Sequence, residues 1–268
     1  MIPDFEMVVH QIPTKQDITI IPIYDVHLGS RECREQEFIS FIDSIKDKDN
    51  VFVILGGDLI DNGTRNSVTN IFRATMPPSA QKREMAKILE PIRNKVLCSV
   101  SGNHERRSGK DSSDDDPVYD IMAKLDIEDR HRENMCFLKI QLGEQETVNG
   151  NRNASKYRPS YTLCVTHGSG GGILPGATIN RNERFSYCLD GVDAVIVGHS
   201  HRPMISQPGK IVVDNRNNKV SIVPFKVIVA TSWLNYGDYA MQKMLLPTSL
   251  AMQTVTLSAF KKEMVVTM

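Results

Sequence analysis

The sequence lacks several features that would have assigned it to a broad class. Its 32 Lys and Arg balance its 32 Asp and Glu, so no overall positive charge is present to hold duplex DNA or an anionic membrane. Its longest apolar runs, such as VFVIL, are far too short to span a bilayer. The first residues, MIPDFEMVVHQ, carry two acids and no basic or long apolar segment, which argues against a signal peptide. We therefore expect a soluble cytoplasmic protein without a membrane partner.

Cysteine is scarce and shows no pattern. The chain has five cysteines and no C-x-x-C pair. Their odd number and wide spacing argue against both a disulfide framework and a zinc knuckle. Four of the five lie in apolar or amphipathic stretches, so we expect buried free thiols in a reducing compartment. The five are Cys33, Cys98, Cys136, Cys164 and Cys188.

Strand-like and helix-like segments alternate through the first part of the chain. Its 268 residues, 40% hydrophobic and 24% charged, fit a globular protein with a sizeable core. Period-3.6 spacing predicts helices, and short apolar runs predict buried strands. The predicted helices are 35–48, 79–92, 116–126 and 180–191, the last ended by Gly191, and the predicted strands are 17–25, 51–58, 95–103, 161–168 and 193–201.

The character of the sequence changes after about residue 203. The segments 203–207, 210–231, 252–258 and 263–268 are all typical of strands, and DNRNN within the second of them is typical of a hairpin turn. Strand–helix alternation followed by strands predicts an α/β layered fold with a mixed β-sheet, flanked by helices. We expect one domain over residues 1–268, with a strand-rich C-terminal part from about 203.

Residue types that bind metals follow five of the predicted strands. In an open α/β sheet, ligands bind beyond the carboxyl ends of the strands, so these residues are expected to converge. Carboxylate, imidazole and amide oxygen suit Mn²⁺, Fe²⁺ and Zn²⁺. Seven ligands are too many for one tetrahedral zinc but suit two metals about 3.5–4 Å apart with a shared carboxylate. The residues are Asp25, His27, Asp58, Asn103, His167, His199 and His201.

The order D-x-H, G-D, G-N-H-E, H and G-H-S-H resembles the calcineurin-like metallophosphoesterase superfamily from about Thr19 to His201. The resemblance implies a layered β-sandwich and a site for two metals. It assigns Asp25, His27 and His201 to one metal, Asn103, His167 and His199 to the other, and Asp58 to a bridge between them. It also implies that His104 contacts the substrate phosphate and protonates the leaving oxygen, and that Asp61 orients His104.

The resemblance implies hydrolysis of a phosphoric ester with two divalent ions, in which Mn²⁺ is favoured and Fe, Zn or Ni are alternatives. Phage and bacterial members described as phosphoesterases or putative DNA-repair exonucleases are similar in the segments around 169–201 and 232–244. We therefore expect a phosphodiesterase acting on a nucleotide or single-stranded nucleic acid in a bacterial or phage-infected cell. The alternatives are a phosphomonoesterase, acting on nucleotides or proteins, and a non-catalytic metal-binding regulatory module.

One departure from the protein phosphatases of this superfamily bears on the substrate. In those enzymes the G-D motif is followed by an arginine that binds a monoester dianion, whereas in GDLIDNG the corresponding residue is Asn62. A neutral amide cannot supply that charged, bidentate contact, so the sequence favours a diester. The alternative is that Arg106 or Arg181 replaces the missing arginine.

Other polar and aromatic residues receive structural interpretations. We expect Glu105 to support the loop that contains it, and His10 and His131 to be surface or structural residues. The only tryptophan, Trp233, lies in the apolar segment SWLNYGDYAMQKMLL. We expect this segment to pack in the core or in a homo-oligomer interface rather than to stack on bases.

Overall fold

Two six-stranded mixed sheets pack face to face in the computed structural model of the chain, which describes residues 3–67, 71–111, 115–143, 158–170 and 174–268. The first sheet has the order β14 (Met264–Thr267), β13 (Thr254–Leu257), β2 (Ile18–Ile23), β3 (Val51–Leu55), β4 (Val96–Val100) and β5 (His131–Arg132). The second has the order β1 (Val8–Ile12), β6 (Met135–Leu142), β7 (Ser160–Thr166), β8 (Ala194–Val197), β12 (Lys226–Val229) and β9 (Met204–Ser206).

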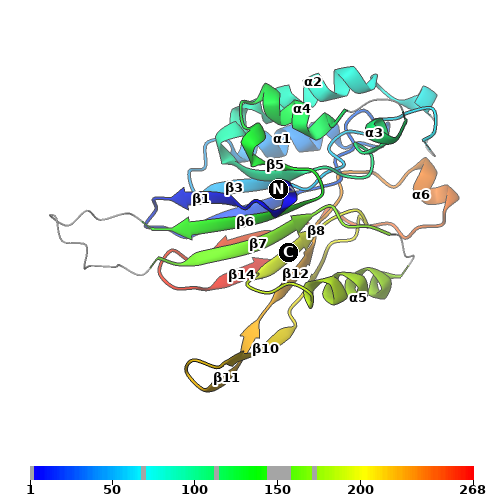
Figure 1. Cartoon of the computed structure of the whole chain (residues 1–268). Coiled ribbons are helices and arrows are strands. Elements are labelled where there is room, and N and C mark those ends of the chain that lie inside the picture. The colour runs from blue at the N-terminus through cyan, green and yellow to red at the C-terminus, as the bar shows by residue number, and fades with distance from the viewer. Residues whose placement is uncertain (1–2, 68–70, 112–114, 144–157, 171–173) are drawn as a thin grey trace.

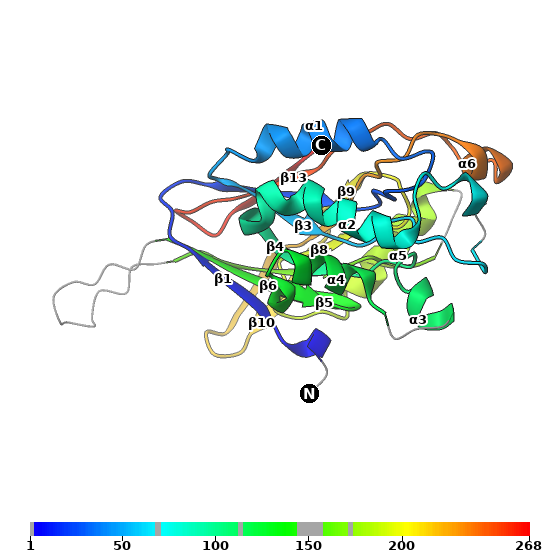
Figure 2. The ribbon, with the colours of Figure 1, turned by 90° about the horizontal axis from the view of Figure 1, so that it is seen from above.

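Helices cover the outer face of each sheet (Figure 1). Figure 2 shows α1 (Glu35–Ile45), α2 (Pro78–Leu89) and α4 (Pro117–Lys124) side by side over the first sheet. The helix α5 (Pro175–Ser186) covers the second sheet. Two short helices, α3 (Arg107–Asp111) and α6 (Asp238–Gln242), complete the set in the described part, with four 3-10 turns: Pro3–Phe5, Ile71–Arg73, Glu90–Lys95 and Glu128–Arg130. The predicted mixed sheet sandwich flanked by helices is confirmed.

Three hydrophobic clusters hold these layers together. One lies between the three helices and the first sheet, and includes Phe38, Ile42 and Ile45 of α1 at the predicted helical spacing. The second lies between the two sheets, and the third lies between the second sheet and α5. Because the central strands of each sheet are covered on both faces, strands such as β3 and β8 are apolar throughout rather than alternating.

The structure adds three strands to those that the sequence predicted, namely β1, β6 and the two-residue strand β5. β6 alternates between half-buried and buried residues and pairs antiparallel with β7. β1 then pairs parallel with β6. β1 and β6 escaped prediction because the polar side chains on their outer faces weaken the hydrophobic signal, and β5 escaped because two residues are too few to show a pattern.

The predicted helix at 180–191 and the predicted burial of the cysteines are each wrong in part. Helix α5 begins earlier, with Pro175 in its first turn, and ends at Ser186, while Gly191, with φ of 72°, lies in the turn beyond it. Cys98, Cys136 and Cys164 are buried and all five cysteines are free, but Cys33 is half-buried and Cys188 is exposed. Cys188 follows α5 on its solvent side, which its sequence neighbours did not reveal. None of the helices in the described part of the chain is long and apolar enough to cross a membrane.

Candidate metal centre

The residues that the sequence selected come together at one end of both sheets. The helix α3, which follows His104 closely in the chain, marks this end in Figure 1. Three strands of the first sheet and two of the second supply the site. The residues are Asp25 and His27 after β2, Asp58 after β3, Asn103 and His104 after β4, His167 after β7, and His199 and His201 after β8.

One group of side chains forms around Asp25. The Asp25 Oδ1 atom lies 3.3 Å from His201 Nε2 and 3.9 Å from His27 Nε2. The two imidazole nitrogens, His27 Nε2 and His201 Nε2, are 3.3 Å apart. These three atoms therefore face a common point, as the ligands of one cation would.

A second group forms around Asn103. The Asn103 Oδ1 atom lies 2.6 Å from His199 Nδ1 and 3.0 Å from His167 Nε2. His167 is held in place from behind, because its Nδ1 lies 2.9 Å from the Gly56 carbonyl oxygen. A carbonyl can only accept, so Nδ1 carries a hydrogen and Nε2 is the ring nitrogen that faces the site.

Asp58 joins the two groups. Its Oδ2 atom lies 3.4 Å from His167 Nε2 and 3.7 Å from His27 Nε2, one residue from each group. Its Oδ1 atom accepts the backbone N–H of His104 at 2.8 Å, which fixes the carboxylate orientation. One oxygen is therefore anchored to the protein, and the other faces both groups.

The donor set fits divalent cations. Asp25 Oδ1 is buried and has no hydrogen-bond partner in the described residues, although its Oδ2 accepts the backbone N–H of His199 at 2.9 Å. A buried carboxylate oxygen without a partner is costly unless a cation completes it. Three overlapping His and Asp groups have ligand atoms within 4.8 Å of one another. These buried clusters are compatible with a binuclear metal centre.

The backbone at the site is strained. Five of the seven candidate ligands have a positive φ angle, a conformation that costs a non-glycine residue about 1–2 kcal/mol. Such outliers concentrate at functional sites, where the surrounding fold enforces them. The angles are 51° at Asp25, 51° at His27, 50° at Asp58, 65° at His199 and 55° at His201.

Protons compete with metals at this site. The Asp58 and Asp25 carboxylates outweigh the effect of burial and raise the pKa of His167 to about 10. By contrast, burial and the neighbouring His104 lower the pKa of His27 well below its usual value. Below pH 10, a cation that binds beside His167 must displace a proton, so metal affinity is expected to rise with pH.

His104 lies beside the two groups, and its ring faces them. Its Nδ1 lies 2.8 Å from the Asp61 carbonyl oxygen and 3.3 Å from Asp61 Oδ1. Its Nε2 lies 3.8 Å from Asp58 Oδ2. Burial by itself lowers the pKa of His104, but Asp58 and Asp61 together raise it above its usual value. The predicted contact between Asp61 and His104 is present, and the Asp61 backbone contributes to it as well as the carboxylate.

Glu105 supports the loop, as the sequence analysis expected. It is fully buried, and its carboxylate accepts four backbone N–H groups. Three of these belong to the segment that begins at Asp58, and the fourth belongs to Gly102, which precedes Asn103. One side chain therefore links the segment after β3, which contains Asp58, to the loop after β4, which contains Asn103.

We expect Glu105→Ala to lower the free energy of unfolding of the metal-free protein by at least about 3 kcal/mol, because it leaves four buried donors without an acceptor. Urea denaturation in the presence of a chelator measures this change. Glu90→Ala, at an exposed residue, is the matched control and should change stability by less than about 0.5 kcal/mol. Equal stability of the two variants would contradict the role assigned to Glu105.

A hydrogen-bond chain that no sequence motif predicted lies behind the Asn103 loop. Ser99 Oγ lies 2.8 Å from His131 Nδ1, and His131 Nε2 lies 2.9 Å from Asp116 Oδ2. Asp116 Oδ1 accepts the Ser101 hydroxyl at 2.7 Å and also caps α4. Ser99 is fully buried, so this arrangement is structural rather than nucleophilic. His131 is thus a structural residue, as expected, and no sequence spacing signals its partners.

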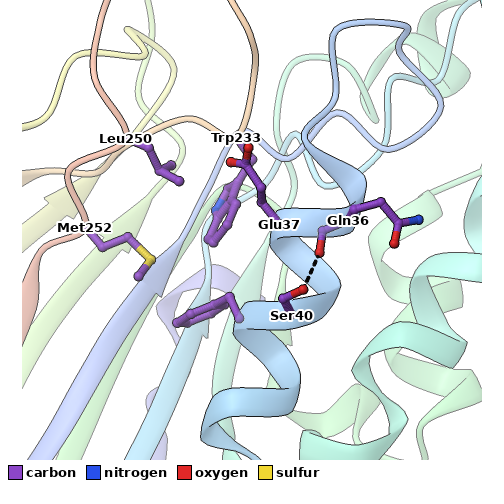
Figure 3. Close-up of a pocket in the computed structure, with 7 residues that line it drawn as sticks. Gln36, Glu37, Ser40, Trp233, Leu250 and Met252 are labelled. Carbon is purple, nitrogen blue, oxygen red and sulfur yellow. Dashed lines mark hydrogen bonds between the residues drawn. The ribbon is translucent and has the colours of Figure 1, made fainter.

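A groove of about 500 Å³ lies away from these residues, between α1 and the segment 250–252 (Figure 3). Trp233 forms part of its wall and is only 2% exposed. The Trp233 ring packs against Phe38 and Phe41, with centroid distances of 5.1 and 5.2 Å. Core packing is confirmed for Trp233 but is wrong for the later part of its segment, where Tyr236, Met241, Met244 and Leu246 are exposed. None of the candidate ligands lines the groove.

Comparisons with known proteins agree with the geometry. The family model described as calcineurin-like phosphoesterase matches residues 23–203. A comparison with curated proteins found no match.

Similar solved structures include a predicted phosphoesterase from Streptococcus pneumoniae TIGR4, with 11% identity, coverage of 95% of this chain and 100% of that chain, and a TM-score of 0.36. A metallophosphoesterase from Sphaerobacter thermophilus has 15% identity, coverage of 90% and 84%, and a TM-score of 0.39. The calcineurin-like phosphoesterase YfkN from Bacillus subtilis has 10% identity, coverage of 94% and 90%, and a TM-score of 0.36. At these TM-scores, no structural detail transfers to this chain.

The matched segment begins at the end of β2 and extends just beyond His201, so it contains every residue of the two groups and covers most of the chain. The chain belongs to the calcineurin-like phosphoesterase family and is a metal-dependent phosphoesterase.

Proposed function

We propose that this phosphoesterase hydrolyses phosphodiesters, with a nucleotide or single-stranded nucleic acid as substrate, and that it uses two divalent ions, of which Mn²⁺ is the best candidate. Asp25, His27 and His201 would hold one ion, Asn103, His167 and His199 the other, and Asp58 both. The bound ions would supply the Lewis acidity that phosphoester hydrolysis requires.

The protein's own contribution centres on His104. Its Nδ1–H donates to the Asp61 carbonyl, so the ring cannot rotate freely and Nε2 stays directed toward the Asp58 carboxylate. The raised pKa favours the protonated ring, which can donate from Nε2 to the leaving oxygen. Asp61 accepts from Nδ1 and stabilises that charge. Asp58 Oδ1 accepts the backbone N–H of His104, which fixes the position of His104 relative to Asp58.

The environment of Asn62 is the observation that carries the diester preference. Asn62 is only 2% exposed, and its amide nitrogen lies 2.9 Å from the His104 carbonyl oxygen and 3.0 Å from Ser108 Oγ. The amide is therefore engaged within the protein and has no charge to offer a substrate. A monoester dianion would lose the clamp that this position supplies in the protein phosphatases, whereas a singly charged diester needs it less.

Phosphomonoester hydrolysis is the second candidate, and Arg107 is the observation that favours it. Its Nη1 donates to the Asp61 carbonyl oxygen at 3.2 Å, and its charge acts on His104. Arg107, rather than Arg106 or Arg181, is therefore the arginine beside the candidate acid. Arg106 donates to the Ser101 carbonyl, and Arg181 extends from an exposed helix face to the Ser169 carbonyl.

We expect kcat/KM for bis-p-nitrophenyl phosphate to exceed that for p-nitrophenyl phosphate at equal Mn²⁺. The neutral Asn62 side chain offers no charged contact to the second negative charge of a monoester. Arg107→Ala should leave this order unchanged. A clear preference for the monoester that disappears in Arg107→Ala would assign the protein to the phosphomonoesterases. Full metal occupancy without turnover of either ester, of cyclic nucleotides or of single-stranded DNA would favour a regulatory module instead.

A further inference from the structure

A two-stranded arm extends from the second sheet. β10 (Gly209–Asp214) and β11 (Lys219–Pro224) form an antiparallel hairpin that pairs with no other strand in the described residues. Figure 1 shows it projecting beyond α5, away from both sheets. The turn between the strands contains Arg216 and Asn217, whose backbone N–H groups donate to Asp214 Oδ1. The hairpin that DNRNN predicted is confirmed.

One face of this arm is apolar and exposed. The register pairs Ile211 with Ile222 and Val213 with Val220, so these four side chains share a face. Their exposures are 74%, 76%, 61% and 70%, respectively. The opposite face is mixed, and Lys210 anchors it by donating to the carbonyl oxygens of Ser186 and Leu189 at the end of α5. An isolated two-stranded ribbon of this kind is marginally stable in water, and contiguous exposed apolar residues mark interaction sites.

The outer edge of β10 lacks the usual protection against pairing. Natural edge strands carry proline, bulges or central charges that prevent another strand from adding. β11 ends in Pro224, which has no N–H to donate, but β10 has no proline, and its centre is Ile211, Val212 and Val213. β10 is therefore the edge at which another strand can add.

The sequence of β10 complements itself. In an antiparallel pair around a two-fold axis through Val212, Lys210 faces Asp214 of a second copy, Ile211 faces Val213, and Val212 faces itself. Two opposite-charge pairs and three apolar pairs result, and no like charges meet. The Lys210 ammonium is held by two carbonyl oxygens at the end of α5 and lies 3.8 Å from the centre of the Phe225 ring, and the Asp214 carboxylate accepts from its own turn, so these pairs add complementary charge rather than a direct hydrogen bond. The same axis joins the two apolar faces into one continuous surface.

We propose that β10 pairs with β10 of a second copy of this chain, so that the two arms form a four-stranded sheet in a homodimer. The proposal rests on the arm alone and holds whatever the substrate. One short strand pair buries less than the roughly 800 Å² per partner of a stable interface, so the dimer is weak and concentration-dependent. It forms at tens of micromolar and dissociates near 1 μM, as expected for a small interface (order of magnitude).

Charge substitutions at Val212 test both the dimer and its register, because this residue meets its own copy on the axis. Val212→Lys alone and Val212→Glu alone each place like charges opposite one another, and each should weaken dimerisation at least tenfold. A 1:1 mixture of the two variants places a lysine opposite a glutamate and should restore the dimer. Sedimentation velocity from about 1 to 200 μM measures the association, a range chosen to bracket a weak interface.

Val9→Lys and Val9→Glu are the matched controls, since Val9 is 54% exposed on the strand β1 and lies outside the arm. Both should associate as the unmodified chain does. Hydrolysis of a chromogenic phosphoester verifies that every variant is folded. A monomeric unmodified chain across the whole range, undiminished dimerisation of the Val212 variants, a mixture that stays monomeric, or open-ended oligomers would each overturn the proposal.

Discussion

Asp58→Asn is expected to lose most of the metal that the unmodified chain retains after reconstitution with Mn²⁺ and dialysis. Asp58 Oδ2 faces His167 and His27, one residue from each group of ligands, so the substitution removes a negative charge from both sites at once. Loss of a residue that only supports a ligand weakens metal binding about 10–100-fold, and loss of the shared ligand should exceed the upper end of that range. Turnover should fall with the metal.

Elemental analysis of the two proteins, expressed as metal per chain, measures the effect. Asp43→Asn, on the exposed face of α1, is the matched control and should keep its full complement. The asparagine oxygen at position 58 can still accept the His104 N–H, so the loop is expected to keep its shape, and thermal unfolding without metal verifies this. Two metals per chain in Asp58→Asn would refute the bridging role.

His104→Ala, unlike Asp58→Asn, should keep its metal and still lose turnover, which should fall by about 10²–10⁴. The His104 ring lies 3.8 Å from Asp58 Oδ2 and packs edge-on against His27, with ring centroids 4.4 Å apart, but the proposed ligand sets of the two ions do not include it. Its loss therefore removes the candidate proton donor and leaves the ligands in place. His10→Ala is the matched control, because His10 bonds to the Leu97 carbonyl far from the site.

The leaving group distinguishes the two roles of His104. If the ring acts as a proton donor, the variant should retain most of its activity on esters that release p-nitrophenolate, which leaves without a proton. If the ring stabilises charge on the phosphoryl oxygens, all substrates should slow together. Asp61→Asn should cost less than His104→Ala, because the Asp61 backbone carbonyl still accepts from Nδ1. Full activity of His104→Ala on every substrate would show that the assignment is wrong.

The sequence predicted the strands that end at the site because they are short apolar runs followed by residues that bind metals. In β2, β3 and β4 the burial of both faces makes the pattern unambiguous. The strands β1 and β6, which carry polar residues on one face, escaped prediction. The sandwich itself was expected, but the assignment of each strand to one of its two sheets was not, since it depends on the antiparallel pairing of β6 with β7, which are separated by a long connection in the sequence.

The identities of the candidate site residues followed from their order along the chain, but the contacts that orient them did not. Glu105 could be assigned to loop support because it stands beside Asn103 and His104, yet its four backbone partners lie in two separate segments. The engagement of Asn62 with the His104 loop likewise needs the fold. The sequence indicated a basic patch at 105–107 but favoured Arg106 over Arg107 as the replacement arginine, because the different directions of adjacent side chains at the start of α3 leave no trace in the sequence.

The left-handed backbone at the candidate ligands bears on how this protein can evolve or be engineered. Glycine is the residue that adopts such angles without cost, so His199→Gly or His201→Gly would remove a ligand and relieve about 1–2 kcal/mol of strain in one step. Substitutions that accumulate under selection for stability alone would therefore remove metal ligands before they changed the hydrophobic core. A library of variants selected for heat resistance alone should yield inactive proteins first, and a screen for hydrolysis has to accompany every round.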